Sequence, residues 1–110
     1  MYASTFTFST KILDDEFHRL DKQIADFARS IDGYLGEEAW EDAKTGLFSN
    51  VYYWESMEAL RQLMEHPLHQ EVKRRQADWL DGYQVVISEI VMSYGNGRIP
   101  HPLSGRSVRR

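Results

Sequence analysis

Polar and apolar residues alternate in several short segments of the chain, and this period-2 pattern predicts β-strands. In the first segment, Phe6 and Phe8 fall on one face, and threonine and serine residues fall on the other. A weaker, acidic segment has Trp40 as its apolar anchor, and the short Thr45-Gly46 turn after it favours a hairpin with the next strand. We therefore expect four strands, at residues 2–12, 36–43, 47–54 and 83–93.

Between these segments, apolar residues recur every three or four positions, which is typical of amphipathic helices. The first such stripe runs from Leu13 to Ile31, with Asp14 or Asp15 as the helix cap. A second helix is expected to begin after Ser56, a good N-cap, and to stop near Glu65. Proline is allowed at the first position of a helix and disfavoured inside one. A further helix is therefore expected from Pro67 to about Leu80.

The predicted order is β-α-β-β-α-β with a broken second helix, which indicates an α+β, ferredoxin-like fold. The last strand is apolar on both faces: Val85, Ile87 and Val91 point one way, and Val86, Ile90 and Met92 point the other. Such a strand needs cover on both sides, but the helices cover only one face of the sheet. The simplest cover for the other face is the sheet of an identical subunit, so we expect a homodimer.

The 110-residue chain is predicted to form one domain over residues 1–93, followed by an extended basic arm over residues 94–110. Pro100 and Pro102 favour the extended form of this arm. The arm contains four arginines and no acidic residue, so the rest of the chain is more acidic than the net charge of −4. An acidic body argues against nucleic-acid binding, which depends on phosphate neutralisation.

The composition excludes several classes of protein. There is no cysteine, which excludes a disulfide scaffold, a thiolate metal site and a cysteine nucleophile. No apolar run approaches the roughly 18 residues of a membrane helix, so we expect no membrane association. The N-terminus lacks the pattern of a signal peptide, and a cytoplasmic protein is expected.

One strand carries the candidate chemistry. Residues two apart on a strand share a face, so Phe48, Asn50, Tyr52 and Trp54 line one side of residues 47–54. An amide, a phenol and an indole on one face suit a pocket for a flat aromatic ligand. The alternative is that the aromatic residues form core and that Asn50 bonds to a neighbouring loop.

The run YYWESMEALRQLMEHPLHQEVKRR, at residues 52–75, and the order of elements resemble the antibiotic biosynthesis monooxygenase family. The resemblance covers about residues 3–93. It implies a dimer of ferredoxin-like units whose sheets pack into a dimeric α/β barrel, with one pocket in each subunit. It also implies oxygenation of a small phenolic or quinol-type substrate without metal, flavin or haem. The substrate anion passes an electron to dioxygen and then combines with it.

The resemblance also implies roles for individual residues. The family's strand asparagine and the tryptophan four residues later match Asn50 and Trp54. Its helical arginine corresponds to Arg74 by spacing, or to Arg75 by helical face. Its proton-relay tyrosine falls near Leu60, and the phenols that could take its place are Tyr52, Tyr53 and Tyr83. The predicted substrate pocket further includes Phe48, Tyr52, His69, Trp79 and Tyr83.

Three alternatives stay open at this point. The protein could be a non-catalytic dimer that binds a small ligand on the same aromatic face. A haem-degrading branch of the family uses a first-strand asparagine, the same tryptophan and a helical histidine. Here the corresponding positions hold Phe8 or Ser9, Trp54 and Lys73, so only the tryptophan matches. The histidines at 66 and 69 have a spacing that metals can use, but the first is better interpreted as the cap of the following helix, and no metal site is expected.

Overall fold

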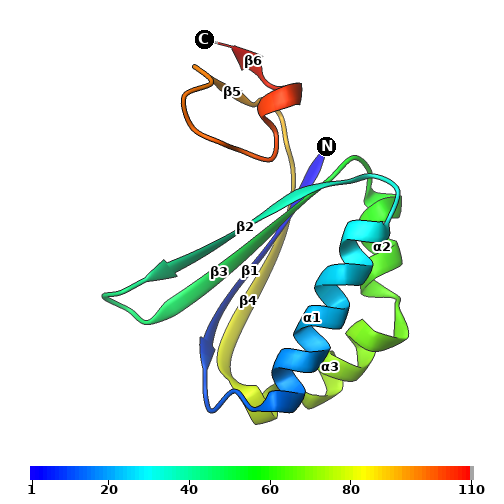
Figure 1. The fold of residues 1–110 in the computed structure, drawn as a ribbon, viewed down its shortest axis with the longest axis vertical. Coiled ribbons are helices and arrows are strands. Elements are labelled where there is room, and N and C mark those ends of the chain that lie inside the picture. The colour runs from blue at the N-terminus through cyan, green and yellow to red at the C-terminus, as the bar shows by residue number, and fades with distance from the viewer. Residues whose placement is uncertain (110) are drawn as a thin grey trace.

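A four-stranded antiparallel sheet forms the centre of the structure, a computed structural model that describes residues 1–109. Its strands lie in the order β2-β3-β1-β4. They are β1 (Tyr2–Thr10), β2 (Tyr34–Asp42), β3 (Leu47–Trp54) and β4 (Leu80–Glu89). The helices are α1 (Asp15–Ser30), α2 (Met57–Met64) and α3 (Pro67–Trp79), and all three lie on one face of the sheet (Figure 1). This confirms the predicted α+β, ferredoxin-like order with a broken second helix.

The last strand differs in its bounds from the sequence prediction. β4 begins at Leu80, directly after α3, and ends at Glu89, so Val91 and Met92 lie beyond it. The Ile90 N–H still donates to the Met1 carbonyl at 2.9 Å. Because β1 starts at Tyr2, no part of that strand remains to pair with the chain after this bond, and the ladder ends here.

The helix starts confirm three predicted caps. The Asp14 carboxylate accepts from the Phe17 N–H at 2.9 Å, and the Ser56 hydroxyl accepts from the Ala59 N–H at 3.2 Å. At the break before α3, the His66 Nδ1 accepts from the Leu68 N–H at 3.1 Å. These bonds satisfy backbone donors that have no partner within the helix. His66 is therefore accounted for as the cap of the helix that Pro67 starts.

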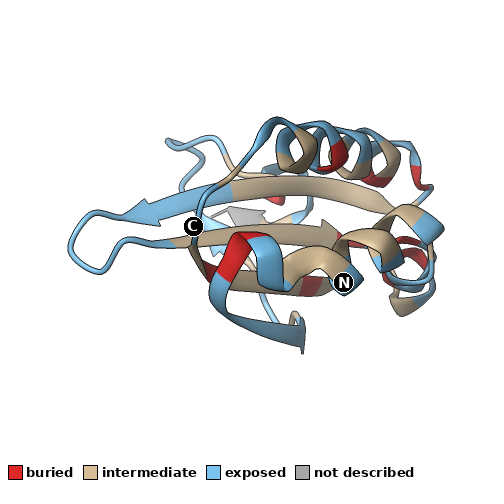
Figure 2. Cartoon of the chain, turned by 90° about the horizontal axis from the view of Figure 1, so that it is seen from below, coloured by how far each residue is buried: buried red, intermediate tan, exposed pale blue. Residues whose placement is uncertain are grey.

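The hydrophobic core lies where α1 and α2 meet the start of the sheet. Figure 2 shows buried residues concentrated between helices and sheet, and an exposed end of the β2–β3 hairpin. Trp54 on β3 is completely buried, and so is Ala28 on α1. The other buried members of this cluster are Ile31, Ala59, Leu60 and Leu63. Leu60, the position where the resemblance expects a tyrosine, is thus a core residue with 2% exposure.

Apolar side chains on β4 stay exposed in the single chain. Val85 and Ile87 are 47% and 39% exposed, and Val86 on the opposite face is 51% exposed. A strand with apolar side chains exposed on both faces is unusual for an isolated subunit. The single chain therefore leaves uncovered the strand from which the homodimer was predicted.

The chain after β4 leaves the sheet and folds back on itself, so the predicted arm is not extended throughout. β5 (Tyr94–Gly95) pairs in parallel with β6 (Val108–Arg109), and a short 3₁₀ helix, η1 (Ser104–Arg106), lies between them (Figure 1). The physical reason is apolar burial, because Leu103 in this segment is only 2% exposed. No helix within residues 1–109 is both long and apolar enough to span a membrane.

Gly33, in the turn between α1 and β2, allows a test of the packing of α2 against this turn. Its φ is +100°, and a Cβ at this position would lie 2.9 Å from the Ala59 Cβ on α2. We expect Gly33→Ala to lower the free energy of unfolding by about 1–3 kcal/mol, measured by chemical denaturation. Gly95→Ala is the control, because a Cβ there meets no atom within 4 Å. Equal stability of the two variants would contradict the described packing at Gly33.

Candidate functional site

The helix-facing side of β3 brings together the side chains predicted from the strand pattern. Asn50, Tyr52 and Trp54 alternate with residues of the opposite face, and they pair across β1 with Phe6, Ser4 and Tyr2. In an antiparallel ladder, directly opposed residues share a face. Tyr52 and Trp54 pack with the core cluster below the helices, which fixes the side of the sheet on which Asn50 also lies.

Trp54 forms the closed end of this face. Its side chain is 0% exposed, and its Nε1–H donates to the Ser4 hydroxyl at 3.2 Å. The Tyr52 ring stacks beside it, with ring centroids 6.0 Å apart and an interplanar angle of 23°. Trp54 therefore holds Tyr52 in place, and it has no free donor of its own.

Asn50 and Tyr52 retain polar groups that could meet a ligand. Both residues are half-buried, and within residues 1–109 neither the Asn50 amide nor the Tyr52 hydroxyl makes a hydrogen bond. Asn50 is flanked on this face by Phe6 of β1 and by the small Ala39 of β2. A short neighbour on one side leaves the amide accessible, so both groups can bond to a bound molecule.

The electrostatics around Tyr52 keep its hydroxyl protonated. Burial raises the pKa of Tyr52, and the nearby carboxylates of Glu37 and Asp21 raise it further, whereas Arg29 opposes them. Burial and neighbouring negative charges disfavour the phenolate, whereas the positive charge of Arg29 favours it. At neutral pH, Tyr52 is therefore a hydrogen-bond donor.

Two carboxylates of this region were not among the residues predicted from the sequence. Glu37 of β2 lies directly opposite Tyr52, and its Oε1 accepts from the Tyr34 hydroxyl and from the Arg29 Nε, each at 2.9 Å. Asp21 of α1 is the second carboxylate. Desolvation raises the pKa of Asp21; His18 lowers it, and Glu37 raises it. The sequence signal was an acidic residue inside the apolar stripe of the first helix.

An aromatic strip continues the same face beyond Asn50. The Phe8 ring stacks on Phe6 at 4.9 Å and on Phe48 at 5.6 Å between centroids. Tyr83 of β4 meets the Phe6 ring edge-on at 5.9 Å and is 51% exposed. The predicted pocket residues Phe48 and Tyr83 thus lie on the face that carries Asn50, and they extend its apolar surface.

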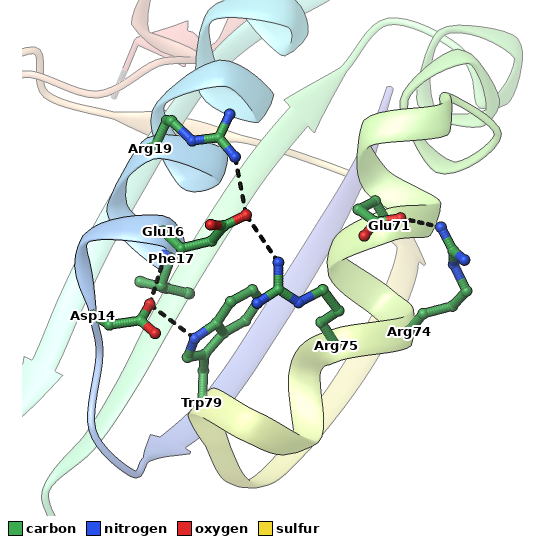
Figure 3. A network of polar contacts seen from close by, with 8 residues as sticks. All are labelled: Asp14, Glu16, Phe17, Arg19, Glu71, Arg74, Arg75 and Trp79. Carbon is green, nitrogen blue, oxygen red and sulfur yellow. Dashed lines mark hydrogen bonds and ion pairs between the residues drawn. The ribbon is translucent and has the colours of Figure 1, made fainter.

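Arg75 and Trp79 take part in the contact between α1 and α3 (Figure 3). The Arg75 Nη1 donates to the Glu16 Oε1 at 2.9 Å, and its guanidinium lies 4.8 Å from the centre of the Trp79 ring. The Trp79 Nε1–H donates to the Asp14 carboxylate at 3.0 Å. The hydrogen bond from Arg75, with a second from Arg19, lowers the pKa of Glu16. In this arrangement both predicted site residues have partners in α1.

Arg74 and His69 lie elsewhere on α3. The side chain of Arg74 is 74% exposed and forms an ion pair with Glu71, one turn earlier (Figure 3). His69 is half-buried, and its Nδ1 is buried without a hydrogen-bond partner among residues 1–109. Desolvation lowers the pKa of His69, and Lys73 lowers it further, so the imidazole is neutral at pH 7.

The opposite face of the sheet carries a separate polar cluster under the C-terminal segment. The Tyr53 hydroxyl donates to the Glu38 Oε1 at 2.6 Å, and the His101 Nε2 lies 3.2 Å from the same oxygen. Burial and the bond to Glu38 raise the pKa of Tyr53 to about 12. Two concavities, of about 380 and 660 Å³, adjoin His101, and neither includes Asn50 or Trp54. Within the described residues, no group of three or more histidine or acidic side chains could hold a metal ion.

Comparison with known proteins identifies the fold. The sequence matches no protein-family model and no curated protein sequence. Solved structures are similar, among them Rv0793 of Mycobacterium tuberculosis, with a TM-score of 0.69, 16% identity, and coverage of 82% of this chain and 94% of that one. A Deinococcus radiodurans protein, provisionally assigned as an antibiotic biosynthesis monooxygenase, has a TM-score of 0.67, 20% identity, and coverage of 84% and 95%.

SnoaB of Streptomyces nogalater, a cofactor-independent oxygenase, is also similar, with a TM-score of 0.67 and 12% identity. The match covers 84% of this chain and 94% of that one. At these identities the likeness shows the fold. The chain therefore has the ferredoxin-like fold that these proteins share, and its activity has to be argued from its own residues.

The Asp14 carboxylate provides a test of the contact between the helices. Asp14→Ala removes both the cap of α1 and the acceptor of the Trp79 indole, so we expect a loss of about 1–3 kcal/mol in the free energy of unfolding. Asp15→Ala, one residue later and exposed, is the matched control and should cost less. Denaturant titration of both variants measures the difference. A loss no greater for Asp14→Ala than for the control would show that the indole bond contributes nothing.

Proposed function

We propose that this protein belongs to the antibiotic biosynthesis monooxygenase family and oxygenates a small phenolic or quinol-type substrate without a cofactor. The fold shared with SnoaB and the run at residues 52–75 support this assignment. The observation that carries it is the pair of free polar groups, the Asn50 amide and the Tyr52 hydroxyl, on the helix-facing side of β3.

The proposed reaction needs orientation and charge stabilisation from the protein. A substrate phenolate passes an electron to dioxygen and then combines with it. One oxygen atom enters the ring, which is oxidised to a quinone, and the other leaves as water. Asn50 and Tyr52 would donate hydrogen bonds to the substrate oxygen or to the reduced oxygen. Trp54 holds Tyr52, and the aromatic strip at Phe48 supports the ring.

The roles of Arg74 and Arg75 stay predictions. Each would have to exchange its present carboxylate partner, Glu71 or Glu16, for a substrate anion. Such an exchange costs little for the exposed Arg74 pair, because surface ion pairs are weak. The assignment of His69, Trp79 and Tyr83 to the substrate pocket also stays a prediction.

The same proposal includes a homodimer in the cytoplasm. The exposed apolar side chains on both faces of β4 support a second sheet as their cover. The chain without cysteine is compatible with a reducing compartment. Packing of two sheets face to face would give the dimeric α/β barrel implied by the resemblance.

A second candidate function is a non-catalytic dimer that binds a small aromatic ligand on this face. Two observations favour it: Trp54 is completely buried, and both candidate arginines are already paired with carboxylates. Such a protein would use the same aromatic and polar groups for binding alone.

Oxygen uptake with a panel of hydroquinones and phenols tests the enzyme. We expect turnover by the wild type and a roughly 10²–10³-fold lower kcat for Asn50→Ala, because one donor to the developing anion is lost. Asn96→Ala is the matched control, since this asparagine lies in the C-terminal segment, away from β3. Protection against thermal unfolding by these phenols, without any oxygen uptake, would favour the binding protein instead.

Sedimentation tests the dimer. At micromolar concentration we expect a species of about twice the 12.9 kDa chain mass. Val86→Lys places a charge on the exposed face of β4 and should shift the protein toward monomer. Gln23→Lys adds the same charge to an exposed position on α1 and should leave the dimer intact. A monomeric wild type would contradict the proposed homodimer.

A further inference from the structure

Asp21 occupies an unusual position in the amphipathic helix α1. Residues seven apart lie on nearly the same side of a helix, and Ala28, seven positions later, is completely buried. Phe17 and Ile24, at the neighbouring positions of the stripe, are half-buried. Asp21 itself is exposed although it belongs to this stripe. Helical geometry therefore places Asp21 on the sheet-facing side of α1, while its side chain stays accessible to solvent.

Neighbouring contacts show which part of the sheet Asp21 faces. α1 packs against β2, and Arg29, two turns after Asp21, reaches Glu37 on that strand at 2.9 Å. Tyr52 lies directly opposite Glu37 on β3. The carboxylates of Glu37 and Asp21 both raise the pKa of Tyr52, which agrees with this placement. Asp21 thus belongs to the region of Tyr52 and Asn50.

The two carboxylates differ in their freedom to react. Glu37 already accepts hydrogen bonds from Tyr34 and Arg29 on its Oε1. Asp21 makes no hydrogen bond or ion pair within residues 1–109. Its carboxylate is therefore free to accept a proton, whereas the Glu37 carboxylate is paired with Arg29.

We propose that Asp21 is the proton acceptor of this site, and that the site takes neutral hydroxylated aromatic molecules in preference to aromatic anions. The proposal rests on the oxygenase function proposed above. Asp21 is then a catalytic residue, because it would touch the substrate hydroxyl. The unpaired carboxylate of Asp21 would disfavour ligands that arrive as carboxylates or phenolates, whereas the charge of Glu37 is balanced by Arg29.

The proton step completes the set of groups on this face. The substrate O–H bond breaks, its proton forms the O–H bond of the Asp21 carboxylic acid, and the electron pair stays on the phenolate oxygen. Tyr52 and Asn50 are donors and can bind that oxygen. Partial desolvation raises the pKa of Asp21, so Asp21 is a stronger base than an aspartate in water. The difference between its pKa and that of a phenol is therefore smaller. The charged or titratable groups that act on Asp21 and Tyr52 are His18 of α1, Glu37 of β2, and Tyr34 and Arg29 beside them.

Asp21→Asn tests the role in turnover, with Asp15→Asn on the same helix as the matched control. For a phenol that is protonated at the assay pH, we expect the kcat of oxygen uptake to fall roughly 10²–10⁴-fold in Asp21→Asn. For a nitro-substituted phenol that is already ionised, the wild-type to variant ratio should approach one. Raising the pH through the pKa of the first phenol should restore the variant. An equal loss for both phenols, or an equal loss in Asp15→Asn, overturns the assignment.

Binding of para-nitrophenol, followed by its phenolate absorbance, tests the contact without requiring turnover. A carboxylate beside the ligand disfavours the phenolate, so Asp21→Asn should bind the phenolate about tenfold more tightly than the wild type. Asp15→Asn should match the wild type. This difference, found without any oxygen uptake by the wild type, would overturn the oxygenase function but retain the contact of Asp21 with the ligand. Absence of binding by the wild type, or equal binding by Asp21→Asn, overturns the proposal about Asp21.

Discussion

The burial of Trp54 is the constraint on which the helix-facing side of the sheet depends. This residue ends β3, lies opposite Tyr2 of β1 and Tyr34 of β2, and donates its indole N–H to Ser4. A slip of one residue in the ladder would turn every side chain to the other face. Such a slip would move the buried Trp54 indole to the other face and put a neighbouring residue in its place in the core. Trp54 therefore fixes the register. Asn50 and Tyr52 therefore stand on the helix side.

The same arrangement separates stability from chemistry. At one end of the sheet the aromatic side chains pack against α1 and α2 and make the core. Further along β3, the half-buried Asn50 lies beside the small Ala39 of β2, and its amide has no hydrogen-bond partner among residues 1–109. Between α1 and α3, the network of Asp14, Glu16, Arg75 and Trp79 holds the helices together. A rigid frame on both sides can position a few free groups for a ligand.

Local patterns carried most of the fold. Alternation in β1 and β3, the caps at Asp14, Ser56 and His66, and the proline break were all readable because each depends on neighbours within a few residues. The end of β4 was not, since it depends on where β1 begins, far away in the sequence. The folded C-terminal segment was also missed, because the burial of Leu103 outweighs the preference of two prolines for an extended chain.

The candidate site was predicted only in part, for a related reason. Strand periodicity placed Asn50, Tyr52 and Trp54 on one face. Helical spacing gave the face of Arg75 but not its partner Glu16, which is 59 residues away in the chain. Asp21 carried a signal, an acid in an apolar stripe, whose meaning depends on Glu37 and Tyr52 across the sheet. Periodicity states which way a residue points, and only the tertiary structure states what it meets.

The C-terminal segment has a consequence for how the sheet can associate. β2 is an edge strand, and such strands present unpaired backbone groups that can recruit further strands and lead to aggregation. Residues 99–102 lie against β2 near Glu37 and Glu38, and Pro102 abuts Gly36. Pro100 and Pro102 have no N–H to donate to a ladder. The segment thus covers the first half of this edge and hinders the addition of a further strand on that side.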